Sequence, residues 1–197
     1  MLKSKINKLD KLLRSPSFTS KEAQTAGVSR TTLVRYLKAG KIERIGYGIY
    51  RGAKAPKFDD FRWEDLYTSV SKVKGGIVCL ISALAIYDLT EEIPRQFWIA
   101  INNKTRHRST SNVRIVRMRN NTLGKTSMKF GEFNLPIFDR ERCIVDAFRY
   151  STTEIAVKAL RKAFSKGGKE KIDPEKLRKY AKALRVDITP YVMAVTT

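Results

Sequence analysis

The fold of this chain is decided first by residues 18–52, FTSKEAQTAGVSRTTLVRYLKAGKIERIGYGIYRG. Thr19 and Glu22 have the spacing of a capping box, which predicts that a short helix begins there. Gly27 follows where a tight turn needs a positive φ, and Ser29 is suited to cap a second helix. These signals predict a helix, a turn and a helix.

The second helix and the hairpin after it complete a recognisable unit. Leu33 and Leu37 lie at i and i+4, so we expect them to form the buried stripe of the helix. Two short segments, 42–45 and 49–51, flank the turn Gly46-Tyr47-Gly48 and predict the two strands of a β-hairpin. This order is typical of a winged helix-turn-helix, which places one helix in a DNA groove.

Polar and basic side chains on the outer faces of this unit are candidates for DNA contact, because they suit phosphate oxygens and base edges. The alternative is that single residues such as Arg35 are only solvated charges. The candidates are Thr19, Ser20, Lys21, Ser29, Arg30, Thr31, Thr32, Arg35, Lys38, Arg44, Tyr47 and Arg51.

The composition agrees with a polyanionic partner. The 197 residues include 40 Lys and Arg against 19 Asp and Glu, a formal net charge of +21. Such a surplus favours nucleic acid and makes binding salt-dependent. The N-terminal sequence lacks the apolar core of a signal peptide, and the longest apolar stretch, 75–87, is too short to span a bilayer. We therefore expect a cytoplasmic protein.

The pattern predicts two domains and an α+β fold. Residues 1–55, including a helix over 2–14, form the winged helix-turn-helix domain. A linker around Pro56 leads to a mixed α+β domain over residues 58–197. There we expect a small antiparallel sheet, preceded by a buried helix over 77–89 and followed by further helices.

The segment 93–131 contains no acidic residue and nine basic ones. The functional interpretation is a second nucleic-acid surface, and the alternative is a solvated sheet face; the two are nearly balanced. The residues proposed for this surface are Lys104, Arg106, Arg108, Arg114, Arg117 and Arg119.

Signals for catalysis, metal or cofactor binding are weak. His107 is the only histidine and lies among arginines. Cys79 and Cys143 have no companions at metal spacing, and Cys79 lies in an apolar run, which favours a buried reduced thiol. Asp139, Glu141 and Asp146 are better suited to cap a helix. We expect no enzyme activity, no cofactor and no metal.

Four segments in order resemble the AbiEi-type antitoxins of bacterial type IV abortive-infection toxin–antitoxin systems. They are GVSRTTLVRYLKAGKIERIGYGIYR (27–51), SALAIYDLTEEIP (82–94), the pair FWIAINN and VRIVRMR (97–103 and 113–119), and LPIFDRERCIVDAFRY (135–150). Together they cover nearly the whole chain.

The resemblance implies a repressor that binds inverted repeats in its own promoter and neutralises a nucleotidyltransferase-like toxin, usually without a stable complex. It implies that the helix from Ser29 to Lys38 contacts DNA, that residues 44–51 form the wing, and that residues 58–197 carry antitoxicity. A role in phage resistance follows from the same resemblance. No heptad-length zipper is present, which is compatible with a monomer that pairs only on DNA.

Two alternatives stay open. The first is a winged-helix transcription factor whose C-terminal domain senses a ligand or dimerises. The second is an RNA-directed enzyme in which the winged unit is an accessory, although an acid–base constellation for it is missing.

Overall fold

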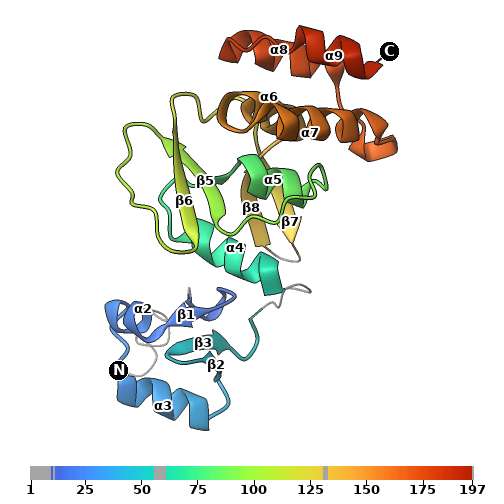
Figure 1. The fold of residues 1–197 in the computed structure, drawn as a ribbon. Coiled ribbons are helices and arrows are strands. Elements are labelled where there is room, and N and C mark those ends of the chain that lie inside the picture. Colours follow the sequence, from blue (N-terminus) through green and yellow to red (C-terminus); the bar gives the residue numbers. More distant parts are fainter. Residues whose placement is uncertain (1–9, 11, 56–60, 131–132, 197) are drawn as a thin grey trace. The chain divides into compact units, whose positions relative to one another are not determined.

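The computed structural model describes residue 10 and residues 12–55, 61–130 and 133–196. The chain forms two compact units (Figure 1). Unit 1 comprises residues 1–68 and 130–133, and unit 2 comprises residues 69–129 and 134–197. The helix predicted over 2–14 lies largely outside the described residues, of which 10, 12 and 13 are helical.

Unit 1 contains two short helices and a three-stranded sheet. Its elements are β1 (Phe18–Thr19), α2 (Ser20–Thr25), α3 (Arg30–Lys38), β2 (Ile42–Gly46) and β3 (Ile49–Gly52), followed by the start of α4 (Phe61–Ser71). The sheet order is β1-β3-β2, and both pairings are antiparallel. The helices and hairpin agree with the sequence prediction, whereas β1 was not predicted because it has only two residues.

Local signals fix the ends of these helices. Thr19 caps α2 in the predicted capping box, with its hydroxyl accepting from the N–H of Glu22. Gly27 has a φ of +83°, so the chain turns there at a conformation that favours glycine. Ser29 caps α3 by accepting from the N–H of Thr32. The unit packs around one core, formed by Phe18, Ala23, Val28, Leu33, Tyr36 and Ile42.

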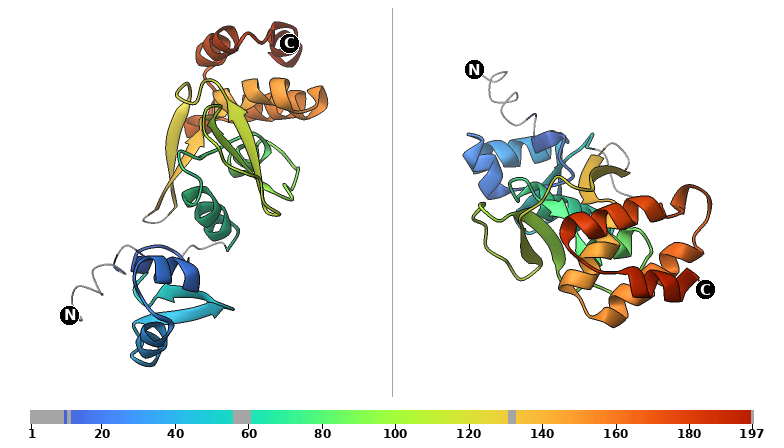
Figure 2. Two further views of the ribbon diagram at one scale, coloured as in Figure 1. Left: turned by 90° about the vertical axis from the view of Figure 1, so that its left-hand side faces the viewer. Right: turned by 90° about the horizontal axis from the view of Figure 1, so that it is seen from above.

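Unit 2 joins a sheet to a group of helices (Figure 2). Its elements are β4 (Ile77–Val78), α5 (Leu80–Ile86), β5 (Phe97–Asn102), β6 (Val113–Met118), β7 (Lys125–Phe130), β8 (Phe133–Phe138), α6 (Arg140–Tyr150), α7 (Thr153–Ser165), α8 (Pro174–Leu184) and α9 (Thr189–Thr196). Phe130, the last residue of β7, and Phe133, the first residue of β8, belong to unit 1. Helix α5 packs on β5 and α6, α7 and α8 pack on α6, and α9 packs on α7.

The prediction of a small antiparallel sheet in this part of the chain is wrong, because the sheet is mixed. The five strands have the order β6-β5-β4-β8-β7, and both β5–β6 and β4–β8 are parallel. Residues 103–112 return the chain to the start of β5, so that β6 runs in the same direction as β5. Alternation along a strand reports its faces but not its direction. The buried helix expected over 77–89 is also shorter, because Ile77 and Val78 form strand β4.

A fully buried arginine joins α6 to the sheet. Arg142 Nε donates to Asp146 Oδ2 at 2.7 Å, and its Nη atoms donate to the carbonyls of Leu123 and Asn120 at 2.8 and 3.0 Å. The guanidinium lies 4.6 Å from the centre of the Phe138 ring. Burial of a charge costs free energy unless it is paired and hydrogen-bonded, and these contacts provide both.

We expect Arg142→Gln to lower the free energy of unfolding by about 3 kcal/mol, because the buried Asp146 carboxylate would keep only the partly exposed Arg149 as a charged partner. Urea denaturation measures the change. The control is Lys158→Gln, which removes an ion pair whose side chains are 72% and 73% exposed and should cost about 0.5 kcal/mol or less. Equal losses for both variants would contradict the central role of Arg142.

Candidate nucleic-acid interface

Helix α3 separates a buried face from an exposed one. Leu33 and Tyr36 are buried in the core of unit 1. The residues that lie outward recur at i, i+1, i+4, i+5 and i+8, and therefore share one stripe. They are Arg30, Thr31, Val34, Arg35 and Lys38. Four of these were predicted as DNA contacts, and the structure brings them together on one face.

The β2–β3 turn carries an exposed aromatic ring beside an arginine. Tyr47 is 95% exposed. The Arg44 guanidinium lies 5.7 Å from the centre of its ring, and Arg44 Nε donates to the carbonyl of Gly46 at 3.2 Å. A cation beside an exposed ring at the tip of a hairpin provides a surface suited to a sugar–phosphate backbone.

Several predicted contact residues also have local structural roles. Thr19 and Ser29 cap α2 and α3, and Thr32 lies 2.9 Å from the Ser29 hydroxyl. The N–H and the hydroxyl of Ser20 both donate to the carbonyl of Gly48, so Ser20 holds the hairpin turn against α2. Lys21 is exposed on α2. The hydroxyl residues thus shape the unit whether or not they contact a ligand.

Arg51 has a structural role that the sequence did not indicate. Its guanidinium pairs with both carboxylate oxygens of Glu64, and its Nε donates to the carbonyl of Pro16 at 2.8 Å. The side chains of Arg51 and Glu64 are only 13% and 8% exposed. This ion pair, in which Nη2 of Arg51 donates to both oxygens, connects β3 to α4 within unit 1 and restricts the access of Arg51 to a ligand.

The second basic stretch lies on β6, on the connection that precedes it and at Arg119, directly after the strand. Lys104, Arg106, Arg108 and Arg119 are exposed. Arg114 lies 4.0 Å from the centre of the Trp98 ring, and Arg117 donates to the carbonyl of His107 at 3.1 Å. The Ser109 hydroxyl also accepts from the N–H of Ile115 in β6. The connection is therefore attached to β6, and the six predicted residues belong to one basic region.

The described residues offer little for catalysis. No group of three or more His, Cys, Asp or Glu that could hold a metal ion occurs among them. Both cysteines are buried and free, as expected, and burial raises the pKa of each thiol. A neutral buried thiol is a poor nucleophile. His107 has its Nδ1 2.9 Å from the carbonyl of Arg108.

The three acidic residues around the start of α6 have structural partners. Asp139 caps α6, and Glu141 accepts from the N–H of Asp173. Both also pair with Lys176 of α8, and Asp146 pairs with Arg142. These carboxylates position helices, which explains their presence without acid–base chemistry. In the described part of the chain, no helix is long and apolar enough to cross a membrane.

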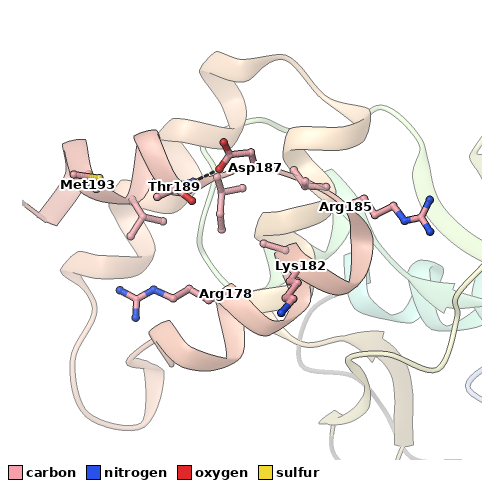
Figure 3. A pocket seen from close by; sticks show the side chains of 10 residues that line it. Arg178, Lys182, Arg185, Asp187, Thr189 and Met193 are labelled. Carbon is pink, nitrogen blue, oxygen red and sulfur yellow. Dashed lines mark hydrogen bonds between the residues drawn. The ribbon is translucent and has the colours of Figure 1, made fainter.

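A groove of about 610 Å³ lies between α8 and α9 (Figure 3). Ile188 and Val192 contribute apolar surface to it, and Arg178, Lys182 and Arg185 contribute cations. The side chains of Arg178 and Arg185 extend in opposite directions, with Lys182 between them. The sequence did not indicate this groove, because α9 was not predicted.

Comparison with known proteins identifies the N-terminal segment. Residues 7–51 match the family model described as "Transcriptional regulator, AbiEi antitoxin". This match confirms the AbiEi resemblance for the first of the four segments, which lies within residues 7–51. It covers α2, α3, β2 and most of β3, which include the exposed α3 face and the Tyr47 turn.

The overall fold also has a solved counterpart. The crystal structure of the RV2827C protein from Mycobacterium tuberculosis is similar, with a TM-score of 0.51 and 15% sequence identity. The similarity covers 91% of this chain and 71% of that one. At this identity it shows a shared fold alone. No curated protein matches the chain.

We expect Arg51→Ala to lower the free energy of unfolding by about 3 kcal/mol, because the mostly buried Glu64 carboxylate would lose its partner. The matched control is Arg44→Ala on the neighbouring strand, where the exposed side chain should contribute about 0.5 kcal/mol or less. Thermal or urea denaturation measures both. If Arg51→Ala kept full stability and weakened only DNA binding, Arg51 would be a contact residue and not a structural one.

Proposed function

We propose that this AbiEi-type chain is the antitoxin of a type IV toxin–antitoxin system and represses its own operon. In this proposal unit 1 is a winged helix-turn-helix that binds inverted repeats in promoter DNA. Helix α3 lies in the major groove, and the β2–β3 hairpin is the wing that contacts the backbone or the minor groove.

The observation that carries the proposal is the exposed face of α3, within a segment that matches the AbiEi regulators. Arg30, Arg35 and Lys38 provide cations there, and Thr31 provides a hydroxyl. Arginine pairs with guanine or phosphate, and hydroxyl groups contact phosphates and bases. No acidic side chain occurs within α3, so its exposed face carries cations without an opposing charge.

The antitoxic role belongs, in this proposal, to residues 58–197. The functional partner is a nucleotidyltransferase-like toxin, countered without a stable complex. The protein acts in the cytoplasm, has no enzyme activity of its own, and pairs on DNA. Among the described side chains, the cysteines are buried and the carboxylates around the start of α6 form ion pairs, which agrees with a role that depends on binding.

We further propose that the basic region on β6 and its connection is a second nucleic-acid surface. The exposed residues Lys104, Arg106, Arg108 and Arg119 lie in the segment without acidic side chains. Arg114 lies against Trp98, and Arg117 donates to a backbone carbonyl, so these two side chains are already positioned. Contacts from this region would go to phosphates and would carry no sequence preference.

Arg30→Ala combined with Arg35→Ala tests the assigned helix. We expect the double variant to lose promoter binding by at least about thirtyfold, since each arginine contributes about 1–3 kcal/mol. Mobility shift or fluorescence anisotropy with the full chain and the DNA upstream of its gene measures the loss. Both residues are exposed, so the fold should be unchanged. Binding at full strength would refute the assignment of α3.

The same double variant separates repression from antitoxicity. The neighbouring gene product is induced alone, with the full chain, or with the double variant, from promoters that this protein does not regulate. The proposal requires rescue of growth by both forms. Rescue by neither form, or no toxicity to rescue, would favour a plain transcription factor.

A paired neutralisation tests the second surface. We expect Arg106→Gln with Arg108→Gln to weaken binding equally on all DNA sequences and to reduce the slope of log K against log salt by about 2. The control is Lys171→Gln with Lys179→Gln, which removes the same charge from exposed positions elsewhere in unit 2. An equal effect of both pairs would mean that only net charge matters.

The alternative function, a transcription factor with a ligand-sensing C-terminal domain, has one observation in its favour. The groove between α8 and α9 combines apolar walls with the cations of Arg178, Lys182 and Arg185 and the carboxylate of Asp187, which suits a small polar organic molecule. Under this alternative, promoter affinity would change with a small molecule, and Lys182→Ala would abolish the response. Promoter affinity that no small molecule changes, together with rescue from the toxin, would exclude it.

A further inference from the structure

Val34 occupies the middle of the exposed face of α3. Its side chain is 51% exposed, in a helix whose other large apolar residues are buried or half-buried. Arg30 lies four residues before it and Lys38 four residues after it, so both are its neighbours on the same face. A single apolar side chain is therefore surrounded by polar groups on the surface proposed to contact DNA.

Folding alone gives no reason for valine at this position. Its β-branched side chain has a lower helix propensity than Ala, Lys or Arg. Exposed apolar residues are common on protein surfaces, so one example is weak evidence. However, seven large apolar side chains are exposed among the described residues, and four of them are Val34, Ile45, Tyr47 and Ile49. The exposed apolar surface is thus concentrated on α3 and the hairpin, the two elements proposed to contact DNA.

The chemistry of valine limits which base edge it can contact. Valine has no donor or acceptor, so it cannot pair with the polar atoms of guanine, adenine or cytosine. Thymine alone presents an apolar group in the major groove, its C5-methyl. A polar edge placed against valine would instead lose hydrogen bonds to water without replacement.

We infer that Val34 is a specificity-determining residue that contacts the C5-methyl group of a thymine in the major groove. The inference rests on the proposed DNA binding by α3. Arg30 and Arg35 provide affinity and pairing to phosphate or guanine, whereas Val34 selects thymine at one position of the site. Burial of one methyl group gives about a fourfold preference.

The test begins with selection of double-stranded DNA sites from a random library, with the full chain and with Val34→Ala. We expect the wild-type sites to contain a thymine at a position that Val34→Ala no longer distinguishes. That thymine is then replaced by deoxyuridine, which removes only the methyl group. The wild-type chain should bind the deoxyuridine site about fourfold more weakly, and Val34→Ala should bind both sites equally.

Two controls accompany this measurement. Deoxyuridine at a thymine outside the assigned position should leave the affinity of both chains unchanged. Thr31→Ala, a neighbour on the same exposed face, should retain the fourfold sensitivity to the methyl group even if its overall affinity falls.

A further variant of the tested residue, Val34→Thr, keeps one methyl on a side chain of nearly the same shape and should retain part of the sensitivity.

The outcomes separate the inference from the function on which it rests. If the wild-type chain enriches no DNA site, both the DNA-binding function and the role of Val34 fail. If a site is enriched but removal of each thymine methyl affects wild type and Val34→Ala equally, the inference is overturned and DNA binding stands.

Discussion

A buried guanidinium needs a counter-charge and an acceptor for its N–H groups, and Arg142 meets this need with groups from several segments. Asp146 supplies the charge one helical turn away, and the carbonyls of Asn120 and Leu123 come from the connection between β6 and β7. Gly124 follows with a φ of +70°, and a Cβ there would lie 2.6 Å from Arg142 Cβ. The path of this connection is therefore set by the arginine.

The start of α6 also determines how the C-terminal helix α8 packs. Asp139 caps α6 three residues before Arg142, and it also accepts from the Tyr180 hydroxyl of α8 at 3.0 Å. Lys176 pairs with Asp139 and with the buried Glu141. The carboxylates at the start of α6 thus attach α8, while the arginine one turn further attaches the sheet. Both carboxylates therefore take part in structural ion pairs.

Unit 1 depends on a different constraint. Its nine-residue helix α3 must bury one face in the core and leave the opposite face exposed to solvent. Leu33 and Tyr36 anchor α3 in the core, and the caps at Thr19 and Ser29 fix where α2 and α3 begin. The remaining face is free of acidic residues and carries three cations around Val34. A helix that contacts DNA needs a buried face that holds it in place and an exposed face whose side chains can contact phosphates and bases.

Sequence alone was sufficient where the signal was local. Capping boxes, a glycine turn and i, i+4 apolar spacing depend on neighbours within a few residues, so α2, α3 and the β2–β3 hairpin were predicted correctly. The basic segment 93–131 was equally visible in the sequence. The family resemblance, confirmed over residues 7–51, depended on the same local motifs.

Only the tertiary structure decided which partners distant residues take. Three features depend on contacts between residues at least 13 positions apart in the sequence. They are the parallel direction of β6, the pairing of Arg51 with Glu64, and the burial of Arg142. A charged side chain has the same sequence signature whether it faces water, a carboxylate or a phosphate. The exposure of Val34 was likewise not evident, because apolar residues favour the core unless the packing leaves no room for them. The sequence by itself determined α2 and α3 with their caps. The folded chain determined which charges remain available to a ligand, since long-range packing satisfies some of them and leaves others in solvent.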